Sequence, residues 1–172
     1  MAFVLLGIGS NIDRHRSIAS GLDALQDLFG EMSLSSVYDT ESIGFIGQPF
    51  LNLVVEIETD WTVAHLVGHL RAIEFAHGRP ANPERGSPRQ LDIDILTYDV
   101  LLGCVAGVEL PRGEILENAY VLQPLAELRP NQFHPENGIC YRELWSDFDQ
   151  SSQQLARVDF QWRGQQISAA QG

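Results

Sequence analysis

The stretch Leu91-Asp92-Ile93-Asp94-Ile95-Leu96 alternates between apolar and acidic side chains over its first five residues. A period of two is typical of a β-strand with one buried face, so this segment predicts a strand. Its apolar residues then point into the core, and Asp92 and Asp94 lie side by side on the opposite face. Two neighbouring carboxylates repel each other, so each is stabilised by a nearby cation.

Five elements are predicted before this strand, from apolar runs, alternation and helical spacing. In chain order they are a strand at 3–8, a helix with the apolar stripe Ile18, Leu22 and Leu25 that ends at Gly30, strands at 33–40 and 50–59, and a helix at 62–77. The order through residue 96 is then β-α-β-β-α-β. It predicts an α+β fold with a ferredoxin-like core, in which two helices cover one face of a four-stranded antiparallel sheet.

The C-terminal part adds further helices and strands to this core. The sequence predicts a short hairpin at 98–108, helices at about 119–128 and 140–148, and a last strand at 155–162. The chain has 172 residues, of which 44% are hydrophobic, and this fits one core of ordinary size. We therefore expect a single domain over residues 1–162 and a frayed tail over residues 163–172.

Charge and composition exclude several classes of function. A formal charge of −12 argues against a nucleic-acid binder, which needs a basic face for the phosphates. No apolar run approaches the roughly 18–20 residues of a membrane span, and no basic segment precedes the N-terminal run as in a signal peptide. Cys104 and Cys140 suggest neither a disulfide framework nor a metal site. We expect a cytoplasmic monomer whose partners are small molecules.

The basic residues gather just before the aspartate strand. All 11 are arginine, and the segment 79–91 holds Arg79, Arg85 and Arg89 but only one acid. Its three prolines and one glycine prevent a regular element, and loops of this length are usually functional or disordered. Arginine binds phosphate oxygens with two parallel hydrogen bonds, and Mg²⁺ prefers carboxylates together with phosphate oxygens. The pattern indicates a Mg²⁺–nucleotide site; the alternative is that Asp92 and Asp94 form surface salt bridges to these arginines.

Several motifs occur together in order. They are Gly9-Ser10-Asn11, Phe50-Leu51-Asn52, the run from Pro88 to Leu96, the run from Leu122 to Leu128, and Phe133-His134-Pro135. In this combination the chain resembles the 6-hydroxymethyl-7,8-dihydropterin pyrophosphokinase family from residue 3 to about residue 135. The resemblance implies an enzyme of folate biosynthesis that transfers pyrophosphate from ATP to the pterin, giving AMP and the pterin diphosphate.

The resemblance also implies roles for individual residues in catalysis and ATP binding. Asp92 and Asp94 would hold two Mg²⁺ ions, and Arg79 and Arg89 would act with them in catalysis by binding the triphosphate. Arg85 would help to close the loop over ATP. The remaining contacts to ATP or its site would come from Glu74, Ile95, Val108 and Arg112. Glu74 reads as a support for the site or equally as a surface acid, and Ile95 and Val108 as adenine contacts or plain core.

For the pterin, the resemblance implies a pocket at the other end of the same site. Asn52 would hydrogen-bond the pterin edge, helped by the backbone from Thr40 to Ile43. Phe50 and Tyr120 would sandwich the flat ring, as offset aromatic stacking favours. From the sequence alone, ordinary core packing is the simpler explanation of these two aromatics.

This chain departs from the family pattern at several ATP-site positions. Gly86-Ser87 replaces a loop aromatic, Arg112 stands where many members have histidine, Asn118 replaces an arginine, and Ala81 replaces a second basic residue. These changes motivate one alternative, a divergent non-catalytic pterin- or nucleotide-binding paralogue. A regulatory ferredoxin-like module is a further alternative, but such a module needs neither the aspartate pair nor the arginine loop.

Overall fold

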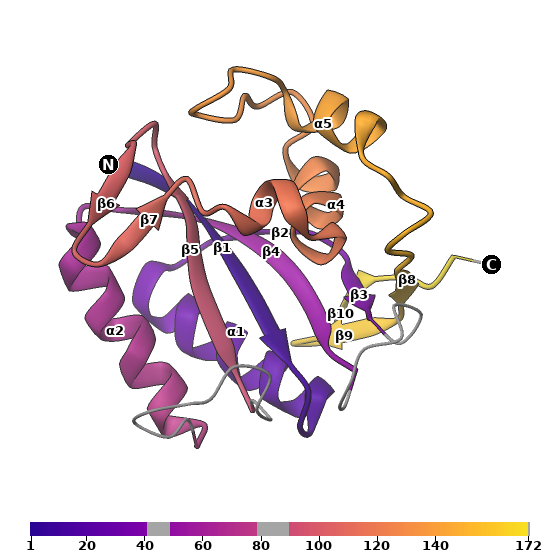
Figure 1. The fold of residues 1–172 in the computed structure, drawn as a ribbon. Helices are drawn as coiled ribbons and strands as arrows, with labels where there is room; N and C mark the ends of the chain where they lie inside the picture. The colour runs from indigo at the N-terminus through magenta and orange to yellow at the C-terminus, as the bar shows by residue number, and fades with distance from the viewer. Residues whose placement is uncertain (41–48, 79–89, 172) are drawn as a thin grey trace.

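The computed structural model describes residues 1–40, 49–78 and 90–171, and it combines helices with antiparallel sheet (Figure 1). The predicted Ile43, Arg79, Arg85 and Arg89, together with Ala81 and Gly86-Ser87, lie outside these residues. The helices are α1 (Arg14–Phe29), α2 (Val63–Ala76), α3 (Glu114–Glu117), α4 (Ala119–Leu128) and α5 (Tyr141–Asp147). The strands are β1 (Ala2–Ser10), β2 (Ser33–Leu34), β3 (Val37–Asp39), β4 (Leu51–Thr59), β5 (Asp92–Tyr98), β6 (Gly103–Val105), β7 (Val108–Leu110), β8 (Ala156–Val158), β9 (Phe160–Trp162) and β10 (Gln165–Ser168).

The main sheet has the strand order β5-β1-β4-β3-β8, and β2 also pairs with β4. All of its strand pairs are antiparallel. β1 is central and pairs with β4 from Ala2 opposite Thr59 to Ser10 opposite Leu51. β5, the predicted aspartate strand, forms one edge of the sheet beside β1.

Helices cover both faces of this sheet (Figure 1). On one face Val4, Leu6 and Ile8 of β1 pack with the apolar stripes of α1 and α2 in the larger core. On the other face Leu5 of β1 and Leu96 of β5 pack with α4 and Tyr141 of α5 in a second core. Among the C-terminal elements, α3, α4 and α5 contribute residues to this second core.

The alternation of β1 explains where the second core stops. Leu5 points into it, and the next two residues on the same face are Gly7 and Gly9. Neither glycine has a side chain to pack against a helix, so this end of the face is left to polar residues of β4 and β5. Of the functional groups predicted from the sequence, Asn52 of β4 and Asp92 and Asp94 of β5 lie there.

The predicted frayed tail was wrong. Residues 163 and 164 form the turn of a β9–β10 hairpin, with positive φ angles of 51° at Arg163 and 75° at Gly164. Phe160 on β9 is buried in the larger core and stacks on His15 of α1 at 5.3 Å between ring centroids. The indole Nε1 of Trp162 donates a hydrogen bond to Asp23 Oδ1 at 2.9 Å. These contacts hold the C-terminal hairpin against α1.

The predicted last strand is also divided in two. β8 pairs with β3 and extends the main sheet, whereas β9 pairs with β10.

Among the described residues, no helix is both long enough and apolar enough to cross a membrane.

Candidate active site

The centre of the candidate site is the backbone of Gly9 in β1. The register places Gly9 between Asn52 of β4 and Asp92 of β5, and Gly7 between Val54 and Asp94. A Cβ atom at Gly9 would lie 2.7 Å from Asn52 Nδ2 and 3.4 Å from a ring carbon of Phe50. The glycine is therefore required by the close approach of Asn52 and Phe50, the two side chains for which the family resemblance implies contact with the pterin.

Asn52 has an unusual hydrogen-bonding state. Its Oδ1 atom is buried and has no hydrogen-bond partner among the described residues. A buried acceptor without a donor lowers the stability of the fold by about 1–3 kcal/mol. Such atoms in a native protein are commonly hydrogen-bonded by a ligand or by water. Asn52 can accept a hydrogen bond from a ligand that enters beside Gly9.

Thr40 holds the neighbouring Phe50 in place. The backbone N–H of Thr40 donates to the carbonyl of Phe50 at 3.0 Å, and the Thr40 Oγ1 accepts from the Phe50 N–H at 2.8 Å. This double contact joins the end of β3 to the start of β4. The predicted substrate residues Thr40, Phe50 and Asn52 thus lie together at one end of the sheet.

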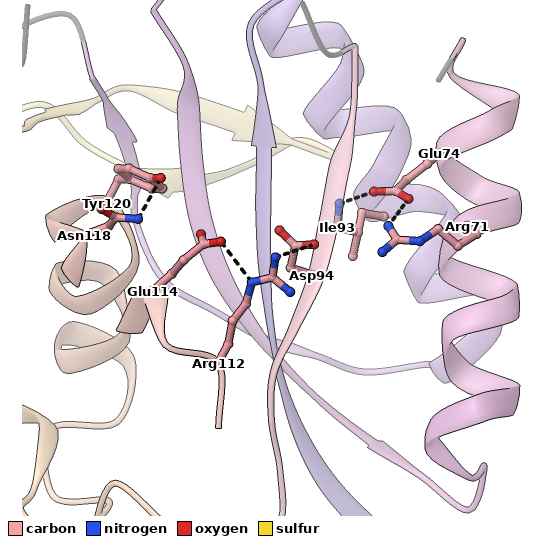
Figure 2. A network of polar contacts seen from close by, with 8 residues as sticks. All are labelled: Arg71, Glu74, Ile93, Asp94, Arg112, Glu114, Asn118 and Tyr120. Carbon is pink, nitrogen blue, oxygen red and sulfur yellow. Dashed lines mark hydrogen bonds and ion pairs between the residues drawn. The ribbon is translucent and has the colours of Figure 1, made fainter. Parts of the chain in front are cut away.

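Tyr120 approaches from α4 on the same face of the sheet. Its ring packs at the edge of the second core, and its hydroxyl accepts a hydrogen bond from Asn118 Nδ2 at 2.9 Å (Figure 2). Burial is the main cause that raises the pKa of the Tyr120 hydroxyl to about 12, and the charges of Glu114, Asp94 and Asp92 contribute to this shift. Tyr120 therefore stays protonated at neutral pH and lies within electrostatic reach of both aspartates.

Asp94 is partly buried, with 20% of its side chain exposed against 30% for the neighbouring Arg112. Burial raises its pKa to about 7, and the neighbouring Asp92 charge acts in the same direction. Arg112 opposes this effect, with its Nη2 atom 3.7 Å from Asp94 Oδ1. The carboxylate pair thus carries the mutual repulsion expected from its spacing.

Glu74 ties helix α2 to the edge of β5. Its side chain is fully buried, and Oε2 accepts a hydrogen bond from the backbone N–H of Ile93 at 2.8 Å (Figure 2). Oε1 pairs with Arg71 Nη1 at 2.5 Å, and the carboxyl also hydrogen-bonds Asp92. Burial is the main reason that the pKa of Glu74 is raised. The surface-acid alternative is excluded, and Glu74 instead fixes the backbone between the two aspartates.

A small pocket opens beside Asp94 between α2, β5 and β7. It is lined by Val67, Leu70 and Arg71 of α2, by Ile93, Asp94 and Ile95 of β5, by Val108 of β7, and by Arg112. The two predicted adenine contacts therefore share a pocket with a predicted metal ligand. Ile95 also belongs to the larger core, so it contributes to both.

Two residues of this network were not predicted from the sequence. Arg71 binds Glu74, and Glu114 accepts a hydrogen bond from Arg112 Nε at 3.2 Å. The spacing of three between Arg71 and Glu74 on one helix was the available signal for the first pair. Arg112 and Glu114 are only two positions apart, but the turn between β7 and α3 that brings them together carries no periodic pattern.

A sequence model of the 7,8-dihydro-6-hydroxymethylpterin-pyrophosphokinase (HPPK) family matches residues 5–130. The chain belongs to this family. A 2-amino-4-hydroxy-6-hydroxymethyldihydropteridine pyrophosphokinase of Aquifex aeolicus is 32% identical over 150 residues, which cover 86% of this chain and 91% of the relative. The Methylorubrum extorquens enzyme of the same name is 36% identical over 163 residues, covering 92% of this chain and all of the relative (100%).

Solved structures of HPPK-containing chains have the same fold. The wild-type HPPK-DHPS of Plasmodium falciparum superposes with a TM-score of 0.71 at 12% sequence identity, covering 98% of this chain and 50% of that one. This chain thus spans about half the length of that solved chain. At such low identity the likeness shows the fold, and the HPPK family assignment rests on the sequence matches.

Proposed function

We propose that this chain transfers the pyrophosphoryl group of ATP to 6-hydroxymethyl-7,8-dihydropterin, which yields AMP and the pterin diphosphate for folate synthesis. The observation that carries the proposal is the row Asn52, Gly9 and Asp92 across three neighbouring strands. It sets an amide oxygen that has no hydrogen-bond partner among the residues described on one side of a glycine, and a carboxylate pair on the other. The reaction needs such an arrangement, because one substrate is a flat heterocycle and the other a polyphosphate.

The pterin would bind at the Asn52 end of the row. The ring amino and amide groups of the pterin are hydrogen-bond donors, and the Asn52 Oδ1 is a buried acceptor without a donor in the described part of the chain. Phe50 and Tyr120 offer aromatic faces for the ring, and Thr40 holds Phe50. Ile43, with its backbone, would complete this subsite.

The aspartate pair fits Mg²⁺. Hard oxygen ligands suit this ion, which usually binds one or two carboxylates and takes its other ligands from water and substrate phosphate. Among the described residues, no group of three or more His, Cys, Asp or Glu side chains is arranged to hold a metal ion by itself, so Asp92 and Asp94 would share the ions with the triphosphate. Two bound ions would neutralise the phosphate oxygens that approach the pterin hydroxyl.

ATP would lie along β5. Ile95 and Val108 would flank the adenine in the pocket beside Asp94, and Arg112 would contact the phosphates there. Glu74 would act indirectly, since it holds the Ile93 amide between the two carboxylates. Arg79, Arg85 and Arg89 would bind the triphosphate and close over it.

The chain would act mainly by positioning. The hydroxymethyl oxygen attacks the β-phosphorus in line, a new P–O bond forms, the bond from the β-phosphorus to the bridging oxygen of AMP breaks, and the hydroxyl proton is released. Asn52, Phe50 and Tyr120 would orient the attacking oxygen, while the β5 carboxylates would hold the cations that bind the phosphate.

The test is AMP formation from ATP, Mg²⁺ and the hydroxymethyl pterin, followed by chromatography of both products. We expect stoichiometric AMP and pterin diphosphate, and loss of both with Asp94→Ala. Binding of both substrates without AMP would instead identify the non-catalytic paralogue. AMP formation retained in Asp94→Ala would place the metal site elsewhere.

Three finer assignments belong to the same proposal. The order β5-β1-β4-β3, with α1 and α2 on one face, supports a ferredoxin-like βαββαβ core. We also propose that the protein is a monomer and acts in the cytoplasm. Sedimentation at micromolar concentration and cell fractionation test these two assignments.

A further inference from the structure

Arg112 stands between two acidic side chains at the edge of the candidate site (Figure 2). Its Nε donates a hydrogen bond to Glu114 Oε1 at 3.2 Å, and its Nη2 lies 3.7 Å from Asp94 Oδ1. The Arg112 side chain is 30% exposed. Its backbone N–H donates to the Leu96 carbonyl of β5 at 2.8 Å, so the segment that carries it is attached to the aspartate strand.

The two contacts of Arg112 are unequal. The contact to Glu114 has the distance of a hydrogen bond, whereas the contact to Asp94 is longer than one and is a charge–charge contact. Glu114 therefore anchors the guanidinium by a hydrogen bond. Asp94 is stabilised by the positive charge of the guanidinium without a hydrogen bond to it. A group held in this way can leave Asp94 without losing its anchor.

The charge of Arg112 lies where a metal cation would be attracted. Asp94 is partly buried beside Asp92, and a positive charge nearby compensates their repulsion. A divalent cation that approaches Asp94 alone must then compete with a guanidinium already in place. The other arginine that lines this pocket, Arg71, is bound to Glu74 at 2.5 Å.

We propose that Arg112 is a built-in counter-cation of Asp94, which makes the nucleotide-free site a poor metal site and couples metal binding to nucleotide binding. The proposal rests on the proposed function, because it takes Asp94 as a metal ligand. Triphosphate oxygens offer Arg112 a more strongly charged partner than a carboxylate at 3.7 Å. When Arg112 turns to the phosphate, Asp94 becomes free to bind the metal that arrives with the nucleotide.

The proposal predicts opposite effects of one substitution on two measurements. Free Mn²⁺ is measured by electron paramagnetic resonance during titration of the full chain, without nucleotide and with a non-hydrolysable ATP analogue. Without nucleotide, Arg112→Gln should bind Mn²⁺ about tenfold more tightly than the unmodified chain, since a like charge near the ion is removed. With the analogue, the same variant should bind the Mn²⁺–nucleotide complex about tenfold more weakly, because a phosphate contact is lost.

Two further variants separate charge from structure. Arg129→Gln removes an arginine of similar exposure, 33%, that pairs with Glu56 at 2.6 Å, and it should leave Mn²⁺ binding unchanged. Arg112→Lys keeps the positive charge, so it should bind Mn²⁺ without nucleotide as weakly as the unmodified chain. Circular dichroism of each variant confirms that the fold is retained.

The outcomes also distinguish this inference from the proposed function. The counter-cation role would be overturned if Arg112→Gln, without nucleotide, binds Mn²⁺ no more tightly than the unmodified chain. It would also be overturned if Arg112→Lys gains as much Mn²⁺ affinity as Arg112→Gln. If Asp94→Asn binds Mn²⁺ as the unmodified chain does, with and without the analogue, then Asp94 is not a metal ligand. That result would remove the proposed metal site itself, whatever Arg112 does.

Discussion

The buried carboxylate of Glu74 accepts a hydrogen bond from the backbone N–H of Ile93, the residue between Asp92 and Asp94, at 2.8 Å. β5 is an edge strand, so this N–H would otherwise lack a partner in the sheet. Helix α2 thus supplies the bond that a further strand would have supplied. The geometry of the aspartate pair therefore depends on a buried residue of a neighbouring helix.

Substitution of Glu74 should therefore lower the free energy of unfolding. Glu74→Ala leaves the Ile93 N–H and the Arg71 guanidinium unpaired, and we expect a loss of about 3 kcal/mol in the free energy of unfolding. Glu74→Gln keeps an acceptor for Ile93 and should lose about half as much. Urea denaturation of both variants measures this difference. Equal losses in the two variants would mean that the Ile93 bond contributes nothing.

The raised pKa of Asp94 predicts how stability varies with pH in the metal-free protein. Its pKa is about 7 in the folded chain and about 3.9 in the unfolded chain. Below about pH 4 both states hold the proton, whereas between about pH 4 and 7 only the folded state does, so stability falls as pH rises through this window. The full penalty, up to about 4 kcal/mol, is present above the folded pKa.

Asp94→Asn removes this titration and provides the comparison. In the presence of a chelator, the free energy of unfolding of Asp94→Asn should exceed that of the unmodified chain by an amount that grows from pH 4 to 7. Urea denaturation at several pH values measures the two curves. Parallel curves would show that Asp94 titrates at its ordinary pKa.

The aspartate pair and Asn52 illustrate what could be predicted from the sequence. A period of two is a local property, so the shared face of Asp92 and Asp94 follows from six residues. That Asn52 lies opposite Gly9 depends on the register between strands more than 40 residues apart, and no local pattern specifies it. The family resemblance supplied the role of Asn52, and the structure supplied the reason for the glycine.

The prediction for the C-terminus was wrong for a related reason. Gln165–Ser168 carries little apolar alternation, and its strand forms because Arg163 and Gly164 make a tight turn. The hairpin is then held by single long-range contacts such as Trp162 to Asp23. Contacts of this kind depend on the position of α1, which periodicity cannot reveal.

Gly9→Ala should weaken pterin binding more than it weakens the fold. The new Cβ would lie 2.7 Å from Asn52 Nδ2, so the amide must move away from its position. We expect the pterin affinity to fall at least about tenfold, since a misplaced hydrogen-bonding group costs about 1.5 kcal/mol or more. Isothermal titration calorimetry with the pterin and an ATP analogue measures this effect.

Gly68→Ala is the matched control for Gly9→Ala. Gly68 lies in α2, and a Cβ there meets no atom within 4 Å. This substitution should stabilise the helix by about 0.5–1 kcal/mol and leave pterin affinity unchanged. Unchanged pterin affinity in Gly9→Ala as well would show that Asn52 does not bind this substrate.

Substitution of either aromatic residue, Phe50 or Tyr120, should weaken the binding of the pterin but not the binding of an ATP analogue. Phe50→Ala and Tyr120→Ala should each weaken pterin binding by about 1–3 kcal/mol through lost area and stacking. Tyr120→Phe loses only the hydrogen bond from Asn118, so it should retain most of the affinity. Calorimetry with both ligands is the check, and equal losses for pterin and ATP analogue would assign these residues to the core.

The C-terminal hairpin connects to the pterin end of the site through Ser168. Its buried Oγ accepts a hydrogen bond from the Val37 N–H at 2.9 Å and donates to the Val158 carbonyl at 2.5 Å. Ser168 thus joins β10 to β3 and β8, and β3 leads directly to Thr40, which holds Phe50. A change at the last strand should therefore reach the pterin pocket.

Ser168→Ala leaves the Val37 N–H and the Val158 carbonyl without this partner, so we expect a loss of about 1–3 kcal/mol in the free energy of unfolding. Because β3 loosens, pterin affinity should fall while the affinity for an ATP analogue stays the same. Ser152→Ala removes a comparable hydroxyl at an exposed turn, where Oγ donates to the Asp149 carbonyl, and should change stability by less than about 0.5 kcal/mol. Equal stability in both variants would show that the C-terminal hairpin does not support the pterin end of the sheet.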